Sequence, residues 1–276
     1  MIAVILTCHN RKEKTLACLR SLYNISSSFK IYLTDDACTD GTSTAIKNEF
    51  PDVYIIKGDG NLFWSRGMYT AWKEAIKSDY DYYLWLNDDI ELFPFFLEEL
   101  FYCERLKGGQ CIISGLIADK STKKIIYGGT NSNKQLCQES DTPQEISHMN
   151  GNVVLIPRSV VKKIGIIDPT FHHDLGDVDY GLTAIENGIK VYSTRKAIAL
   201  GYSNNYCRVR KWNSSLSQRL SRLHSPLGSN PKINFYFRKK HYGTINAIIY
   251  TIYIYTINFM PDWLIVKLFG KAYLDQ

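Results

Sequence analysis

The stretch YYLWLNDDIEL, residues 82–92, decides how the fold is interpreted. It opens with five aromatic or aliphatic residues, a run that predicts a strand buried on both faces of a sheet. Asn87 follows and then two adjacent carboxylates, Asp88 and Asp89, whose negative charges repel each other. Two explanations are open: the pair caps the next helix, as aspartates at strand ends often do, or it binds a cation that offsets the repulsion.

The composition is that of a folded soluble protein. The chain has 276 residues, of which 45% are hydrophobic and 22% charged, so it can bury a substantial core. Its seven cysteines are scattered without Cys-x-x-Cys spacing, which argues against a disulfide framework or a zinc site and favours a reducing cytosol. The first apolar run is short and no basic residue precedes it, so we expect no export signal.

Strand and helix patterns alternate over the first 92 residues. Short apolar runs predict strands at 3–7, 30–34, 53–57 and 81–86. Helical patterns lie at 16–22, after residue 40 and at 68–77. Apolar strands separated by helices imply a parallel sheet covered on both faces, whose ligands bind beyond the carboxyl ends of the strands. Polar clusters follow all four predicted strands, at 7–11, 35–36, 58–61 and 87–89.

The glycines of the chain do not form a dinucleotide-binding fingerprint. That fingerprint needs Gly-x-Gly-x-x-Gly directly after the first strand. Here Gly58 and Gly60 follow the third predicted strand, and Phe63 stands at the third glycine position. The lysine loop of the P-loop nucleotide-binding proteins is absent as well. The sequence therefore disfavours a Rossmann dehydrogenase.

Four segments in this order resemble the family 2 glycosyltransferases of the GT-A fold. They are AVILTCHNR (3–11), TDDACTDGT (34–42), WLNDDIEL (85–92) and the segment 149–192, which begins MNGNVVLIP. A closer similarity is to the bacterial rhamnosyltransferase-like branch that builds surface polysaccharides. It lies in NLFWSRGM (61–68), WLNDDI (85–90) and FHHDLGDVDYG (171–181). The resemblance covers roughly residues 1–240.

This resemblance implies an α/β fold of the GT-A type, a nucleotide-sugar-binding sandwich with a mainly parallel central sheet. It also implies an inverting hexosyltransferase that moves a sugar from a UDP- or dTDP-linked donor to a glycan or polyprenyl-linked acceptor. We expect a glycosyltransferase domain at 1–205, with a nucleotide-binding half at 1–92 and an acceptor half at 93–205. Residues 206–276 are expected to form a basic, helical extension.

The resemblance gives the two carboxylates a role in binding a divalent cation. Asn87-x-Asp89 matches the Asp-x-Asp motif of the family with its first aspartate replaced by asparagine. Asp89 is thereby assigned as the ligand of Mg²⁺ or Mn²⁺, and Asp88 is placed near the ribose or the donor sugar. Such a cation bridges both phosphates and stabilises the charge that develops on the departing diphosphate.

Further donor-binding residues follow from the same resemblance. Asp35 or Asp36 matches the position that accepts a hydrogen bond from the N–H of uracil or thymine, although an aspartate pair also forms turns. Thr7 and Arg11 are expected beside the base and the diphosphate.

A loop after the third predicted strand is expected to shape the donor pocket. It carries Asn61, Trp64 and Gly67. Trp64 is also compatible with a position in the core. The sequence differs from the family in the stretch AIALGYSNN (197–205). Many relatives carry a metal-binding histidine there, where this chain has Leu200.

The segment GDVDYG, residues 176–181, contains the candidate catalytic base. An inverting transferase needs a base that takes the proton from the acceptor hydroxyl as it attacks. Asp177 matches the base position of the family, and a helix that starts there would hold its carboxylate ionised. Asp179 has a capping or positioning role in this interpretation.

Three polar residues lie just upstream, His172, His173 and Asp174. Taken alone they could form a metal cluster, but adjacent side chains on an extended segment point to opposite sides. We therefore expect them, with Asp179, on the acceptor side of the site.

The carboxyl-terminal part is strongly basic. From residue 206 onward it has eleven basic and two acidic residues, a net charge of +9, which leaves −3 for the rest of a chain whose total is +6. Basic residues precede an apolar, tyrosine-rich run in FRKKHYGTINAIIYTIYIYTINFMPDWLIVKLFG (237–270). The part from Ile245 to Met260 is too short and too polar for a confident membrane span. A helix at a membrane interface, or a subdomain packed on the body or on a second subunit of a homo-oligomer, explains this pattern.

Two classes of function stay open. The first is a cytoplasmic glycosyltransferase, peripheral at the inner face of a bacterial plasma membrane. The second is a non-catalytic nucleotide- or sugar-binding relative, which Asn87 and Leu200 favour. A nucleic-acid partner is not expected, because the basic part contains no recognisable nucleic-acid-binding module.

Overall fold

The computed structural model describes residues 1–26, 28–203 and 208–270. The chain divides into two compact units: residues 1–172 with 176–203, and residues 173–175 with 204–276. The domain boundary expected at residue 205 lies outside the described residues, and that division stays a prediction.

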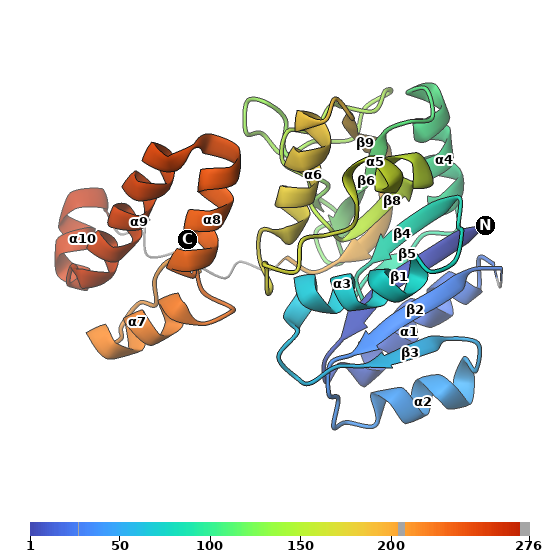
Figure 1. Ribbon diagram of the computed structural model, residues 1–276, viewed down its shortest axis with the longest axis horizontal. Helices are drawn as coiled ribbons and strands as arrows, with labels where there is room; N and C mark the ends of the chain where they lie inside the picture. The colour runs from blue at the N-terminus through green and yellow to red at the C-terminus, as the bar shows by residue number, and fades with distance from the viewer. Residues whose placement is uncertain (27, 204–207, 271–276) are drawn as a thin grey trace. The chain divides into compact units, whose positions relative to one another are not determined.

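The first unit is built on a nine-stranded sheet with the order β3-β2-β1-β4-β8-β6-β9-β5, in which β7 pairs with β6 (Figure 1). Its amino-terminal strands are β1 (Ile2–Cys8), β2 (Lys30–Asp35), β3 (Tyr54–Lys57) and β4 (Tyr82–Leu86). All neighbours among these four strands are parallel, as the alternation of strand and helix patterns predicts. Their carboxyl ends therefore meet at one edge of the sheet.

The second half of the sheet is mixed. Its strands are β5 (Glu91–Leu92), β6 (Ile112–Asp119), β7 (Ile125–Tyr127), β8 (Val153–Pro157) and β9 (Val191–Gly201). Strand β8 runs antiparallel to both β4 and β6, whereas β9 runs parallel to β6. In this register Val153 at the start of β8 pairs with Leu86 at the end of β4. The segment that precedes β8 is thus brought to the edge where β4 delivers its carboxylates.

Helices cover both faces of the sheet (Figure 1). They are α1 (Lys12–Tyr23), α2 (Thr42–Glu49), α3 (Phe63–Ala75), α4 (Phe96–Leu106), α5 (Arg158–Ile164) and α6 (Gly176–Glu186). Strand β1 shows the two layers: Val4 and Leu6 pack with α1, α2 and α4, and Ala3 and Ile5 pack with α3, α5 and α6. This α/β sandwich confirms the predicted fold class.

Helix α3 begins five residues earlier than the pattern predicts, at Phe63 instead of residue 68. The first amides of a helix have no partner within it and need an acceptor from elsewhere. Asp36 supplies one, because its Oδ2 accepts hydrogen bonds of 3.0 Å from the amides of both Leu62 and Phe63. The acceptor lies 26 residues away from Leu62 in the sequence, so local capping rules do not find it.

The second unit is helical, as expected for the carboxyl-terminal extension. It contains α7 (Leu216–His224), α8 (Pro231–Tyr242), α9 (Thr244–Phe259) and α10 (Asp262–Phe269). The buried side chain of Arg210 joins the end of α9 to α10 through the carbonyls of Ile257 and Met260 and the carboxylate of Asp262. Within the described part of the chain, no helix has the length and apolar character needed to cross a membrane.

Candidate functional site

The two carboxylates that follow β4 share one guanidinium. Nη1 of Arg11 lies 3.2 Å from Oδ1 of Asp88 and 3.0 Å from Oδ2 of Asp89. Arg11 follows β1, which is the parallel neighbour of β4, so the residues beyond both strands meet at the same sheet edge. A cation does offset the repulsion of the pair, and it is supplied by the chain itself.

The two aspartates have different surroundings. Asp88 is 5% exposed and accepts a hydrogen bond of 3.1 Å from Oγ1 of Thr15 in α1. Burial raises the pKa of the Asp88 carboxyl to about 6, although the positive charge of Arg11 opposes this shift. The side chain of Asp89 is 29% exposed. Asp88 is therefore anchored in the protein, and Asp89 is the carboxylate that an external ligand can reach.

Asn87 is held by side chains on either side of it. Nε1 of Trp64 donates a hydrogen bond of 2.7 Å to Oδ1 of Asn87, and Nδ2 of Asn87 donates one of 2.7 Å to Oδ1 of Asn152. The backbone amide of Asn87 also donates to the carbonyl of Asn152 at 2.9 Å. Both ends of the Asn87 amide group are thus used inside the protein, so this residue is not placed as a metal ligand.

Asp177 lies in the first turn of α6 and contacts the segment that precedes β8. Its Oδ2 accepts a hydrogen bond of 2.9 Å from the amide of Gly151, and its Oδ1 accepts one of 2.9 Å from the amide of Val178. A Cβ at Gly151 would lie 2.6 Å from the Trp64 ring and 3.0 Å from Cβ of Asp177. Trp64, Gly151 and Asp177 are therefore packed against one another, next to the Asn87–Asn152 pair.

The environment of Asp177 differs from the one expected at a helix start. Burial raises the pKa of the Asp177 carboxyl above its usual value, and the hydrogen bonds from Gly151 and Val178 oppose that rise without cancelling it. A raised pKa makes the carboxylate a stronger base once it is ionised. The two amide donors fix the orientation of both of its oxygens.

Asp36 holds a loop in place. In addition to the two amides at the start of α3, its carboxylate accepts a hydrogen bond of 2.7 Å from the amide of Gly60. The exposed Asn61 belongs to this loop, between the residues that Asp36 binds. Since Asp36 is 2% exposed and engaged with three amides, its contacts give it a structural role.

Asp35 is also buried and has polar partners. It accepts hydrogen bonds from the amide of Cys38 at 2.7 Å and from Oγ of Ser43, and it forms an ion pair of 3.1 Å with Nζ of Lys57. Burial raises the pKa of the Asp35 carboxyl, but these three partners outweigh burial and lower the pKa to about 2. Asp35 is therefore a carboxylate at neutral pH.

Thr7 and Gly67, both expected at the donor, lie where β1 meets α3. A Cβ at Gly67 would overlap Oγ1 of Thr7, and the carbonyl of Gly67 accepts a hydrogen bond of 2.8 Å from Oγ1 of Thr34. Oγ1 of Thr7 is also 3.4 Å from the carbonyl of Thr34. These contacts bring the helix close to the sheet, so they position the neighbouring Trp64.

The acceptor-side residues fall into two groups. His172 and Asp179 belong to the first unit, where the carbonyl of His172 accepts a hydrogen bond of 2.9 Å from the amide of Ser65. His173 and Asp174 belong to the second unit, in which Asp174 forms an ion pair with Arg208. The structure thus joins His172 and Asp179, but not His173 and Asp174, to the unit that carries Asp177.

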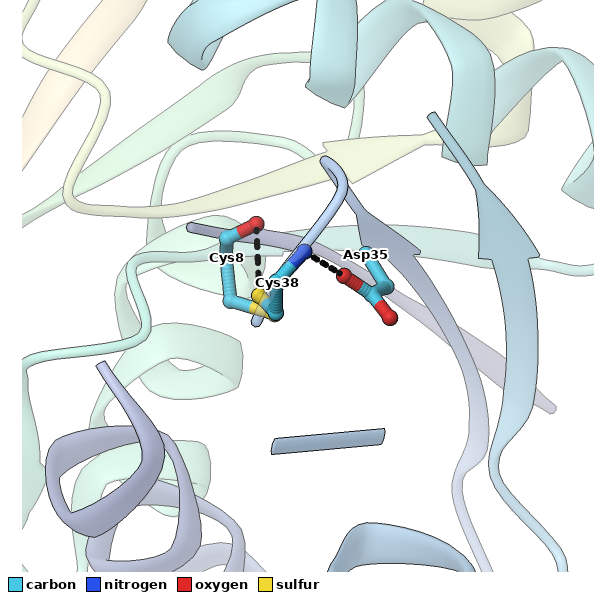
Figure 2. A group of neighbouring side chains, drawn as sticks. All are labelled: Cys8, Asp35 and Cys38. Atoms are coloured by element: carbon cyan, nitrogen blue, oxygen red, sulfur yellow. Dashed lines mark hydrogen bonds between the residues drawn. The ribbon is translucent and has the colours of Figure 1, made fainter. Parts of the chain in front are cut away.

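Sequence reasoning missed two parts of this edge. One is the segment Asn150–Asn152, whose only signal is a polar Asn-Gly-Asn run before an apolar strand. The other is the cluster of Cys8, Asp35 and Cys38, which the sequence scatters and the fold brings together (Figure 2).

The residues at the end of β4 fit a hard divalent cation through Asp89. Arg11 contacts Oδ2 of Asp89, so Oδ1 of this partly exposed side chain can serve as a ligand. Mg²⁺ is commonly held by one or two carboxylates together with substrate phosphates and water. Leu200, at the place expected for a histidine ligand, lies in β9 and pairs with Glu91 of β5.

Comparison with known proteins agrees with this architecture. Residues 3–128 match the family model described as Glycosyl transferase family 2. No curated protein sequence matches the chain. Among solved structures, the crystal structure of S. aureus TarS is similar with a TM-score of 0.56 and 11% identity, over 81% of this chain and 43% of TarS.

Two structures of a shorter form, S. aureus TarS 1-349, are similar as well. The one in complex with UDP has a TM-score of 0.54 and 15% identity, over 74% of this chain and 60% of that chain. The other has a TM-score of 0.55 and 14% identity, over 73% and 60%. The chain thus spans less than two thirds of these TarS chains. The fold of this protein is the GT-A fold, and its residues 3–128 carry the match to glycosyltransferase family 2.

Proposed function

We propose that this protein is an inverting, metal-dependent glycosyltransferase of the rhamnosyltransferase-like branch. It moves a sugar from a UDP- or dTDP-linked donor to a glycan or polyprenyl-linked acceptor in bacterial surface polysaccharide synthesis. One observation carries the proposal: a chain that matches family 2 over residues 3–128 places Arg11, Asp88 and Asp89 at the edge that also holds Asp177. A complex of UDP with a protein of similar fold supports the class of donor.

The donor is proposed to bind along the carboxyl ends of β1, β2 and β4. Arg11 is a cationic side chain at this edge that contacts the diphosphate, while Asp88 lies near the ribose or the donor sugar. Asp35, at the end of β2, lies on the side of the base. Asp89 holds Mg²⁺ or Mn²⁺, which when bound neutralises the charge of the departing diphosphate.

The acceptor is proposed to react at Asp177. Its carboxylate takes the proton of the acceptor hydroxyl while that oxygen attacks the anomeric carbon on the face opposite the diphosphate. The amides of Gly151 and Val178 hold the carboxylate in one orientation, and burial keeps its pKa raised. His172 and Asp179 support the acceptor side from the same unit.

Turnover of a sugar nucleotide tests this proposal. The protein is incubated with a panel of UDP-, dTDP- and GDP-linked sugars and with Mg²⁺ or Mn²⁺, and release of the nucleoside diphosphate is measured. We expect metal-dependent release with a UDP- or dTDP-linked sugar. Binding of nucleotides without release or transfer for any donor would favour the non-catalytic relative, a function that the internal engagement of Asn87 also fits.

The carboxyl-terminal unit is proposed to attach the protein to the inner face of the plasma membrane. Large apolar side chains of α9 and α10 are more than half exposed: Ile245, Ile249, Ile252, Phe259, Trp263, Leu268 and Phe269. Basic residues at 238–240 in α8 precede them. Exposed apolar and basic side chains together are typical of a segment that lies in the interface of an anionic membrane.

A further inference from the structure

Three potential metal ligands meet at the carboxyl ends of β1 and β2. Cys8 ends β1, Asp35 ends β2, and the parallel register places these two residues side by side. Cys38 lies in the loop after β2. The Sγ atoms of Cys8 and Cys38 are 3.8 Å apart, and one ligand atom of each of the three residues lies within 4.8 Å of the others. Figure 2 shows the two thiols and the carboxylate gathered at this edge.

The spacing of the two sulfur atoms fits a tetrahedral metal ion. Zinc–thiolate bonds of about 2.3 Å at a tetrahedral angle separate two sulfur atoms by about 3.8 Å, the distance observed between Cys8 and Cys38. The thiols therefore need no large movement to share one ion. A carboxylate oxygen of Asp35 completes three protein ligands, and water or another small ligand takes the fourth position.

The surrounding backbone orients this ligand set. The amide of Asn10 donates a hydrogen bond of 3.2 Å to Sγ of Cys38, a contact that stabilises a thiolate. The amide of Cys38 donates to Oδ1 of Asp35 at 2.7 Å, so the carboxylate and the thiol loop are fixed to each other. Oδ2 of Asp35 contacts both Oγ of Ser43 and Nζ of Lys57. The Lys57 side chain is 70% exposed and can turn into solvent when an ion binds.

We propose that Cys8, Cys38 and Asp35 form a binding site for a thiophilic divalent cation, with Zn²⁺ as the best-fitting ion. Thiolate ligands select zinc over Mg²⁺ and Mn²⁺, so this site is chemically different from the carboxylate pair after β4. Each thiol loses its proton when it binds the ion as a thiolate. The ion links the end of β1 to the loop that follows β2. The site shares Asp35 with the edge where the donor is proposed to bind, but its test measures Zn²⁺ binding and needs no glycosyl transfer.

The test uses the full chain, Zn²⁺ alone and a phosphine reductant that keeps the thiols reduced. Thermal unfolding is followed as Zn²⁺ is added, and Co²⁺ is used separately for its thiolate charge-transfer band. We expect Zn²⁺ to raise the melting temperature of the wild type and Co²⁺ to produce the band. Cys38→Ser should remove the band. It should also weaken Zn²⁺ binding by more than the loss of about 10- to 100-fold that is typical when a residue that only supports a metal ligand is removed.

Two control variants locate the ion. Cys111→Ser changes a cysteine that is 2% exposed, against 3% for Cys8, and should leave Zn²⁺ binding intact. Asp89→Ala should leave it intact as well. Wild-type affinity for Zn²⁺ in Cys38→Ser would overturn the proposal. A reduced wild type that does not respond to Zn²⁺ would also overturn the proposal. This holds even if an oxidant then joins Cys8 and Cys38 in a disulfide.

Discussion

Nη1 of Arg11 lies 3.0 Å from Oδ2 of Asp89, and the same nitrogen also contacts Asp88. The carboxylate that can reach an external ligand is therefore already paired with a cation of the chain. A diphosphate that binds Arg11 would draw the guanidinium toward its own negative charge and leave Asp89 for a metal ion. This relationship predicts that metal binding at Asp89 is weak without nucleotide and strengthens with it.

Replacement of Asp89 tests the metal site. Asp89→Ala should lower the rate of sugar transfer at least about a hundredfold, because a metal ion at a departing diphosphate supplies several kcal/mol. It should also abolish nucleotide-dependent binding of Mn²⁺, while thermal stability changes little at this partly exposed strand end. Glu91→Ala, an exposed carboxylate two residues further on, is the matched control. Near-normal transfer by the Asp89 variant in the presence of metal would exclude this assignment.

The buried carboxylate of Asp88 makes stability depend on pH. Its pKa is raised from the usual 3.8 to about 6 chiefly by burial, so the folded state binds the proton more tightly than the unfolded state. The contribution of Asp88 to stability is then highest when the pH lies below the pKa that its carboxyl has in the unfolded state. It falls as the pH rises through the pKa of the folded state.

Asp88→Asn removes this titration. The difference in unfolding free energy between wild type and variant should fall by up to about 3 kcal/mol as the pH rises from about 4 to about 7, since one pKa unit corresponds to about 1.4 kcal/mol. Denaturant titrations at several pH values measure it. A difference that stays constant over this range would show that burial does not shift the Asp88 titration.

The position of Asn87 leads to a prediction about the metal motif. Asn87→Asp restores the usual Asp-x-Asp pattern, but it replaces the donor that faces Oδ1 of Asn152 with a second acceptor. We expect a loss of about 1–3 kcal/mol of stability and no gain in metal affinity. Asn133→Asp makes the same chemical change at an exposed asparagine outside the candidate site and is the control. Tighter nucleotide-dependent binding of Mn²⁺ in Asn87→Asp would contradict this account.

The exposed side chains of α9 and α10 lead to a prediction about membranes. The triple variant Ile249→Ser, Ile252→Ser, Trp263→Ser should lose most of its co-sedimentation with anionic vesicles, because burial of each apolar side chain in the interface is lost. High salt should weaken binding of the wild type. Tyr54→Ser, which removes an exposed aromatic residue of the first unit, should bind like the wild type. Equal binding by the triple variant would favour packing against another protein surface.

The parallel half of the sheet could be predicted because its signals are local. The apolar runs and helical patterns between residues 3 and 92 indicate which side chains of each strand or helix are buried, and polar residues mark the strand ends. The pairing of β8 with β4 could not be predicted in this way, since Val153 and Leu86 meet only through the fold. The early start of α3 could not be predicted for the same reason, because the acceptor for its first amides is Asp36, which lies far away in the sequence.

The charged residues that meet at the candidate site could be predicted from the sequence, but fewer of the side-chain contacts there could. Asp88, Asp89 and Arg11 stand at strand ends, so their meeting follows from a parallel sheet. The pairing of Cys8 with Cys38 does not follow from spacing rules, because 30 residues separate them. The spacing of the cysteines argues against a zinc site, whereas the proposed Zn²⁺ site rests on residues that neighbouring parallel strands bring together.

The Asp177→Asn variant tests the assignment of Asp177 as the catalytic base. The variant keeps the size of the side chain but accepts no proton at neutral pH, so the transfer rate should fall about a hundred- to ten-thousandfold. Nucleotide affinity should change little, because Asp177 is proposed to act on the acceptor and not on the donor nucleotide. Asp179→Asn in the same helix and Asp174→Asn in the second unit are the comparison variants.

The decisive measurement is the transfer rate of Asp177→Asn, determined with its affinity for the nucleotide under the same conditions. We expect a large loss of rate at unchanged nucleotide affinity, with smaller losses of rate for the Asp179 and Asp174 variants. Normal transfer by Asp177→Asn together with an inactive Asp179→Asn or Asp174→Asn, or a joint loss of nucleotide binding in all three variants, would contradict it.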